Sequence, residues 1–146
     1  MTVNELMTPN PVCCTPDTTL RDVARMMSAN DCGEIPVVES LQHRLLLGVV
    51  TDRDIVLRAV ADGRNPADTP IANCMTTNVV TVGPDTTMDD CRKLMEEHQI
   101  RRVPVVDAQG CCVGIIAQAD LAWNGREKDV AELVREVSRE NGRPSR

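Results

Sequence analysis

Apolar residues in the first third of the chain follow a helical spacing and then an extended one. The helical stretch repeats at i, i+3, i+4 and i+7, which marks one face of an α-helix: Leu20, Val23, Ala24 and Met27. Thr19 and Asp22 have the spacing of a capping box, so we predict that this helix begins here. Gly33 is expected to end it.

Extended patterns lie on both sides of this helix. Residues 12–14 form a short apolar run before it, and residues 35–38 and 45–50 form two longer runs after it. The polar stretch 39–44 joins the last two runs, so we predict a β-hairpin. Residues 51–54 then open a second helix, which we expect to end near Asp62.

The same pattern occurs a second time. Met7-Thr8 recurs as Met75-Thr76, and Pro36-Val37-Val38 recurs as Pro104-Val105-Val106, in each case 68 positions later. Gly48 and Asp54 recur as Gly114 and Asp120, 66 positions later. One supersecondary unit is therefore built twice. We predict an α/β fold of two β-α-β-β-α repeats, related by a pseudo-two-fold axis and packed through their sheets.

The second copy predicts its own set of elements. Strands are expected at residues 79–82, 102–106 and 111–117, with helices beginning at Thr87 and Asp120. We divide the chain into a first domain at 1–68, with a linker at 63–70, a second domain at 69–124, and a tail at 125–146. The tail carries an apolar stripe that predicts an amphipathic helix before a disordered end at 141–146: Val130, Leu133, Val134 and Val137.

Composition narrows the class of protein. Of 146 residues, 42% are hydrophobic but only 1% are aromatic, so the core must be aliphatic and rich in sulfur. Nucleic acid is not an expected partner, because there are no aromatic rings for base stacking and the net charge is −6. We find neither an apolar run long enough to span a membrane nor a signal sequence. A cytoplasmic protein without membrane attachment is expected.

Catalytic and metal-binding patterns are missing from the sequence. No Ser or Cys nucleophile has a His in a recognisable arrangement, so we expect no enzymatic activity and no required cofactor. The chain has seven cysteines, including the adjacent pairs Cys13-Cys14 and Cys111-Cys112. Adjacent pairs fit neither zinc-site spacing nor a disulfide framework, so no metal site is expected. Reduced core thiols are the first interpretation, and a redox or metal role of these cysteines is the alternative.

The segment Gly48–Asp54 holds the most suggestive side chains. An apolar strand leads here into a helix start that presents the hydroxyl of Thr51, the guanidinium of Arg53 and the carboxylate of Asp54. A helix N-terminus favours phosphate, and an acidic group accepts hydrogen bonds from ribose hydroxyls. Thr51 and Asp54 also have capping-box spacing, so a purely structural role is equally open.

The matching segment of the second copy differs in these side chains. Ala117 and Ala119 replace Thr51 and Arg53, while Asp120 is retained. Arg101-Arg102 stands where the first copy has Gly33-Glu34. These arginines either face a phosphate or lie on the surface, and we expect at most one of them to point into a site.

Together the two copies resemble the cystathionine-beta-synthase (CBS) domain. The resemblance rests on the Met-Thr opening, the Pro-Asp-Thr-Thr turn, the Pro-Val-Val strand and the Gly-apolar-apolar-Thr-x-x-Asp ending. It covers residues 5–124 as a stand-alone tandem pair. Such a pair is expected to bind adenine-containing ligands such as AMP, ADP, ATP, NAD or S-adenosylmethionine in the clefts between its two repeats.

The resemblance also assigns roles to residues. It implies that Asp54 and Asp120 bind ribose, and that Thr51, with Arg53 beside it, and Arg101 bind phosphate. It places Ile35 and Val103, each before the mid-strand Pro36 or Pro104, against the base, with Cys14 and Val82 closing the other face. Ala117 departs from the family pattern, which predicts unequal sites with the phosphate at Thr51 and Asp54.

The expected function is therefore that of a non-catalytic sensor. It would bind an adenosine-containing small molecule, form a homodimer and signal to a target protein that the sequence does not identify. Two alternatives stay open: a ligand-free dimeric adaptor, and a thiol-based redox responder built on Cys13-Cys14 or Cys111-Cys112.

Overall fold

The computed structural model describes residues 1–124, so the predicted tail helix and disordered end lie outside the described residues. Two compact units make up the described chain. One unit contains residues 1–9, 81–107 and 113–124, and the other contains residues 10–80 and 108–112. Each unit is made of segments that are separate in the sequence. The boundary between residues 68 and 69, which divides the sequence into two continuous domains, therefore stays a prediction.

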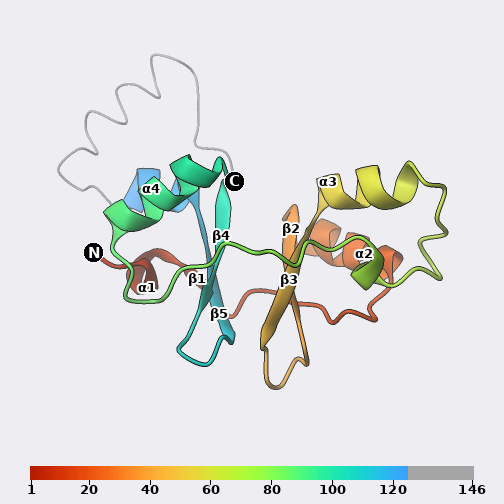
Figure 1. Cartoon of the computed structure of the whole chain (residues 1–146), viewed down its shortest axis with the longest axis horizontal. Coiled ribbons are helices and arrows are strands. Elements are labelled where there is room, and N and C mark those ends of the chain that lie inside the picture. The colour runs from red at the N-terminus through yellow and green to blue at the C-terminus, as the bar shows by residue number, and fades with distance from the viewer. Residues whose placement is uncertain (125–146) are drawn as a thin grey trace, which may run out of the picture. The chain divides into compact units, whose positions relative to one another are not determined.

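The unit of residues 10–80 is built on one antiparallel hairpin. Its elements are α2 (Leu20–Asn30), β2 (Glu34–Val38), β3 (Leu46–Thr51), α3 (Asp52–Ile55), the π-helical η1 (Val56–Val60) and the 3-10 helix η2 (Ile71–Asn73). Glu34 pairs with Thr51 and Pro36 with Val49, with a bulge between Val37 and Val38. Figure 1 shows α2 and α3 on the same side of this hairpin.

The first long helix begins as predicted and ends earlier. Thr19 caps α2 by accepting a hydrogen bond from the backbone N–H of Asp22. Asp31 ends the helix in the left-handed conformation at φ 50°, two residues before the predicted stop at Gly33. A short polar Asp tolerates this conformation, so the helix does not need glycine to end.

The elements of the other unit are α1 (Val3–Leu6), β1 (Thr8–Pro9), α4 (Met88–His98), β4 (Arg102–Val106), β5 (Cys112–Ala117) and α5 (Gln118–Asn124). The first residue of β5, Cys112, is assigned to the unit of residues 10–80 and 108–112. The sheet order is β1-β5-β4. The strand predicted at residues 79–82 is wrong: only Val82 forms a bridge, to Val105. This run has a single paired residue, and an apolar pattern this short does not define a strand without a partner.

Each unit includes the opening segment of the other sequence copy, which pairs with its strands and loops. Thr8 pairs with Ile115 in β5, while Thr76 pairs with Val49 in β3. The backbone N–H of Val3 donates to Thr86 O at 2.9 Å, and that of Ile71 donates to Thr18 O at 2.8 Å. The Met-Thr openings are therefore sheet-pairing segments, which the hydrophobic pattern did not reveal.

Separate apolar clusters form the two cores. The first gathers residues of α2, β2 and β3 together with Ala59, Ile71 and Cys74. The second gathers Val3, Val82, Leu121 and residues of α4, β4 and β5. None of the helices within residues 1–124 is long and apolar enough to cross a membrane.

Candidate functional site

The junction between β3 and α3 carries the predicted first-copy site. Thr51 Oγ1 accepts a hydrogen bond from Asp54 N at 3.0 Å, and Asp54 Oδ2 accepts one from Thr51 N at 3.0 Å. This is a complete capping box, so the structural role that the sequence left open is present. Both side chains are half-buried, and Arg53 between them is exposed.

A backbone hydrogen bond ties this junction to the start of β2. Asp52 N donates to Gly33 O at 2.9 Å. The Asp52 carboxylate lies directly over Gly33, where an added Cβ would meet its Oδ2 at 2.9 Å. Asp52 therefore fills the space that a side chain at position 33 would need, and it was not among the predicted site residues.

Arg58 is a second residue that the prediction missed. Its Nε lies 4.0 Å from Asp54 Oδ1, and its Nη1 donates to Cys74 O and Met75 O, both at 3.2 Å. One guanidinium thus holds the opening segment of the second copy beside the motif carboxylate. The i,i+4 spacing of Asp54 and Arg58 was the available signal.

The residues predicted to contact the base in the first copy are packed into the core. Ile35 has no exposed surface, and Pro36 is buried beside it in β2. Cys14 N donates to Pro36 O at 3.0 Å, and Val38 N donates to Cys14 O at 2.8 Å. The structure thus brings Cys14 next to β2 as expected, but gives Ile35 a packing role. Contact of Ile35 with a base stays a prediction.

The second copy repeats this backbone arrangement. Val82 N donates to Pro104 O at 3.1 Å, and Val106 N donates to Val82 O at 2.9 Å. Val103 is fully buried in the second core, like Ile35 in the first. The same pair of backbone hydrogen bonds therefore joins Cys14 to β2 in one unit and Val82 to β4 in the other.

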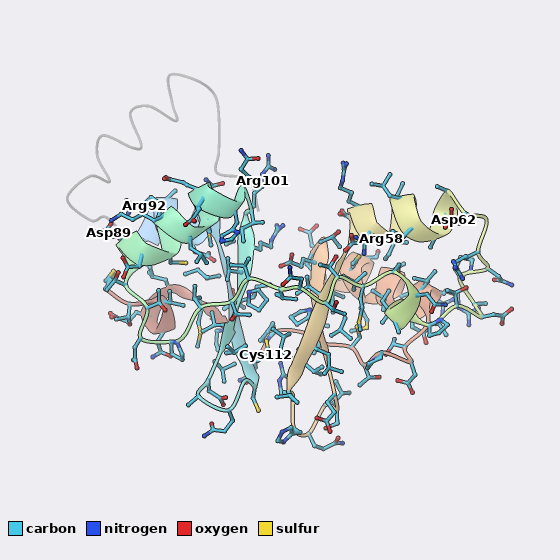
Figure 2. All side chains as sticks on the ribbon, viewed as in Figure 1. Arg58, Asp62, Asp89, Arg92, Arg101 and Cys112 are labelled. Carbon is cyan, nitrogen blue, oxygen red and sulfur yellow. The ribbon has the colours of Figure 1, made fainter. Side chains whose placement is uncertain are left out.

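The junction between β5 and α5 keeps the cap but loses the hydroxyl. Asp120 Oδ2 accepts a hydrogen bond from Ala117 N at 2.9 Å, which matches the Asp54 bond to Thr51. Gln118 N donates to Arg101 O at 2.7 Å, which matches the Asp52 bond to Gly33. Arg101 is exposed immediately before β4, and Figure 2 labels it. An exposed guanidinium thus stands where the first copy has a covered glycine.

Buried thiols lie close to the first-copy site. Burial raises the pKa of Cys14 to about 12, and the Cys74 thiol adds to this shift. Burial also raises the pKa of Cys74, as does the negative charge of Asp54, against the opposing charges of Arg58 and Arg64. Both thiols therefore stay protonated at neutral pH and act as small apolar groups.

Comparison with known proteins identifies the fold family. The CBS domain family model matches residues 3–60 and again residues 71–124. The CBS domain-containing protein YhcV of Bacillus subtilis is 39% identical over 140 residues, which is 95% of this chain and 96% of that protein.

Solved structures give the same result. The CBS domain pair of protein MJ0100, in complex with 5'-methylthioadenosine and S-adenosyl-L-methionine, is 26% identical with a TM-score of 0.73, over 84% of this chain and 93% of that one. Hypoxic response protein I, solved with two coordinated zinc ions, is 31% identical with a TM-score of 0.74, over 84% of this chain and 97% of that one.

The zinc in that relative has no counterpart cluster in the part of this chain that the structure describes. No three His, Cys, Asp or Glu side chains within residues 1–124 are grouped so that they could hold a metal ion. Two successive matches to the family model, and a relative that is covered almost end to end, show that the chain belongs to the CBS domain family as a pair of CBS repeats.

Proposed function

We propose that this CBS pair is a non-catalytic sensor that binds an adenine-containing ligand, such as AMP, ADP, ATP or NAD, and signals to a target protein. The proposal is supported by the family, whose member MJ0100 was solved with two adenosine compounds. Ligand energy would act through unequal affinity for two conformations of the protein, because a ligand that binds both equally shifts nothing.

The observation that carries the proposal is the arrangement of Thr51 and Asp54. The side chain of Asp54 is 16% exposed, and only its Oδ2 is used by the cap. Oδ1 faces Arg58 at 4.0 Å, which is too long for a hydrogen bond. We assign Oδ1 to a ribose hydroxyl, with the Thr51 hydroxyl and the exposed Arg53 toward a phosphate.

The second-copy site is proposed to be different. Ala117 offers no hydroxyl, and the exposed Arg101 is the cationic group that Gly33 cannot supply. Asp120 retains its ribose assignment. We therefore expect two unequal sites, with the phosphate held better at Thr51 and Asp54.

Homodimer formation is part of the proposal. Three apolar side chains on η1 are more than half exposed: Val56 at 54%, Leu57 at 52% and Val60 at 61%. Several large apolar side chains exposed on one short helical segment are typical of an interaction site. Sedimentation velocity tests this point, since a monomer at micromolar concentration contradicts it.

Thermal unfolding with added ligand tests the proposed function. A specific ligand at about 100 times its Kd should raise the Tm by about 5 °C or more. The panel is AMP, ATP, NAD and S-adenosylmethionine, with guanosine monophosphate as the control. If no adenine compound raises the Tm, the sensor proposal is wrong.

A ligand-free adaptor is the second candidate function. One observation favours it, namely that Thr51 and Asp54 already satisfy each other in a complete capping box. An unchanged Tm with every adenine compound, together with a stable dimer, would support this adaptor over the sensor.

A further inference from the structure

Two cysteines far apart in the sequence meet beside an arginine in the unit of residues 10–80 and 108–112. Cys13, Val38 and Cys112 form a small buried cluster of their own. Arg44 Nη2 donates to Cys13 Sγ at 3.0 Å, and the Cys112 thiol donates a hydrogen bond to Cys13. Figure 2 marks Cys112 at the beginning of β5. Cys13 thus clusters with Cys112, while Cys14 lies with Cys74 in the larger core. A redox role of the adjacent pairs Cys13-Cys14 or Cys111-Cys112 stays a prediction.

Arg44 is held tightly in this position. Its Nη2 also donates to Pro11 O at 2.7 Å and its Nε to Cys112 O at 3.4 Å. Arg44 O accepts from Cys112 N at 2.8 Å. Its backbone has φ 64°, a conformation that is uncommon for a residue other than glycine. The fold thus accepts a strained backbone at the residue that brings a positive charge to the sulfur.

The two neighbouring thiols Cys13 and Cys14 have opposite properties. The hydrogen bond from Cys112 and the charge of Arg44 lower the pKa of Cys13, against burial and the nearby Cys14. Burial instead raises the pKa of Cys14 to about 12. The nucleophile in thiol chemistry is the thiolate, which Cys13 forms far more readily than Cys14 does.

We propose that Cys13 and Cys112 form a redox-active dithiol that a hydroperoxide converts to a disulfide, with Arg44 stabilising the Cys13 thiolate. Cys13 retains 7% of its surface exposed and Cys112 only 2%, so peroxide meets Cys13 first. Cys112 then acts as the resolving thiol, because it is already in hydrogen-bonding contact with Cys13.

The chemistry proceeds in two balanced steps. The Cys13 thiolate attacks one oxygen of hydrogen peroxide, the O–O bond breaks, and the departing hydroxide takes a proton to leave as water, which gives Cys13 sulfenic acid. The Cys112 sulfur attacks the Cys13 sulfur, the S–O bond breaks, and the hydroxyl takes the thiol proton to leave as a second water. Two thiols are oxidised and one peroxide is reduced to two waters.

Peptide mapping of the full chain tests this proposal. The reduced protein is treated with hydrogen peroxide, free thiols are blocked with N-ethylmaleimide, and tryptic peptides are analysed by mass spectrometry. We expect an intramolecular disulfide between the peptide containing Cys13 and the peptide containing Cys112, and its loss on addition of dithiothreitol. No intramolecular link, or a link only between chains, overturns the proposal.

Matched variants locate the reacting sulfurs. Cys13→Ser and Cys112→Ser should each abolish the link, while the controls Cys14→Ser and Cys111→Ser should keep it. A link that survives in Cys13→Ser overturns the assignment.

Variants of Arg44 test its charge. Arg44→Gln should slow peroxide oxidation at neutral pH by about tenfold for each unit by which the Cys13 pKa rises, and should shift the pH–rate profile upward. Arg44→Lys keeps the charge and should retain most of the rate. Equal pH–rate profiles for the Gln variant and the wild type overturn the role of Arg44.

Discussion

The two strand-to-helix junctions share their backbone bonds and differ in their side chains. In each, a motif aspartate accepts a hydrogen bond from the residue three positions before it, Asp54 from Thr51 and Asp120 from Ala117. In each, the first helical N–H donates to the carbonyl oxygen of the residue immediately before the neighbouring strand, Gly33 or Arg101. Only the first junction adds a hydroxyl to the cap.

This difference separates what the fold needs from what a ligand needs. The aspartates are explained in both copies by helix capping, so the repetition of Asp120 alone says little about binding. The groups that vary between the copies are the hydroxyl of Thr51 and the guanidinium groups of Arg53 and Arg101. Those are the groups we assign to phosphate, and they make the two sites unequal.

The largest expected effect comes from the glycines in the strands that lead into the two junctions, Gly48 in β3 and Gly114 in β5. A Cβ at position 48 would lie 2.5 Å from Thr76 O, which is backbone, while at position 114 the first obstacle is the Met7 side chain. Because a methionine side chain can move and a backbone carbonyl in a sheet cannot, Gly48→Ala should cost about 2–3 kcal/mol of unfolding free energy and Gly114→Ala less. Urea denaturation of both variants measures this, and equal losses would show that the close approach at position 48 has no cost.

Removing the aspartates should sharpen the comparison of the caps. Asp54→Ala breaks the reciprocal capping box with Thr51 and removes the carboxylate that faces Arg58. We therefore expect the free energy of unfolding to fall by about 1–2 kcal/mol. Asp120→Ala loses one hydrogen bond from Ala117 and should cost about 1 kcal/mol or less. The measurement is again urea denaturation. A larger loss in the Asp120 variant would contradict this ranking.

Exchanging residues 51 and 117 tests the hydroxyl itself. Thr51→Ala should cost about 1 kcal/mol, because the N–H of Asp54 loses its acceptor. Ala117→Thr should add a matching acceptor in the second copy and raise stability by a few tenths of a kcal/mol, about the lower end of capping energies. Thermal unfolding of the two single variants and the double exchange is the measurement. A destabilising Ala117→Thr would mean that the second junction has no room for the side chain.

The smallest effect at neutral pH is expected at Cys14, which stands where the second copy has Val82. The folded pKa of about 12 lies above the ordinary 9.0, so between these values the unfolded chain has lost a proton that the folded chain keeps. Stability from Cys14 is therefore complete below about pH 9 and decreases as the pH rises toward 12, by at most about 1.4 kcal/mol per pH unit.

Cys14→Val should flatten this alkaline loss while leaving neutral stability nearly unchanged. Unfolding by urea at pH 7 and pH 10 measures the slope. Burial also raises the pKa values of Cys74 and Cys91, so these two thiols contribute to the loss of stability with pH in both proteins. Only the difference in slope between the variant and the wild type is assigned to Cys14. An identical slope in the variant and the wild type would show that Cys14 ionises as freely in the folded state as in the unfolded one.

Much of the fold could be predicted because its pattern is local. The helices at Leu20–Asn30 and Met88–His98 follow from apolar spacing and from their Thr caps, and both hairpins follow from paired apolar runs. The strand predicted at 79–82 failed because one bridge at Val82 is all that its neighbours support. The exchange of the Met-Thr openings is a long-range pairing, and nothing in the local pattern indicates it.

The candidate site could be predicted only in part for the same reason. Thr51, Asp54 and Asp120 lie within short motifs, so their positions at helix starts were visible in the sequence. Arg58 was detectable from its spacing to Asp54. The contact of Cys13 with Cys112 joins residues 99 positions apart and depends on the path of the hairpin, so no spacing rule could have found it.

Calorimetric titration of AMP and adenosine into the wild type, Thr51→Ala and Asp120→Asn tests the central claim of unequal adenosine-phosphate sites most directly. We predict that the wild type binds AMP more tightly than adenosine. Thr51→Ala should weaken AMP about tenfold, because one hydrogen bond to a charged group is lost, and should change adenosine little. Asp120→Asn should leave this tighter AMP site unaltered. Absence of AMP binding to the wild type, or equal weakening of AMP and adenosine by Thr51→Ala, would contradict the claim.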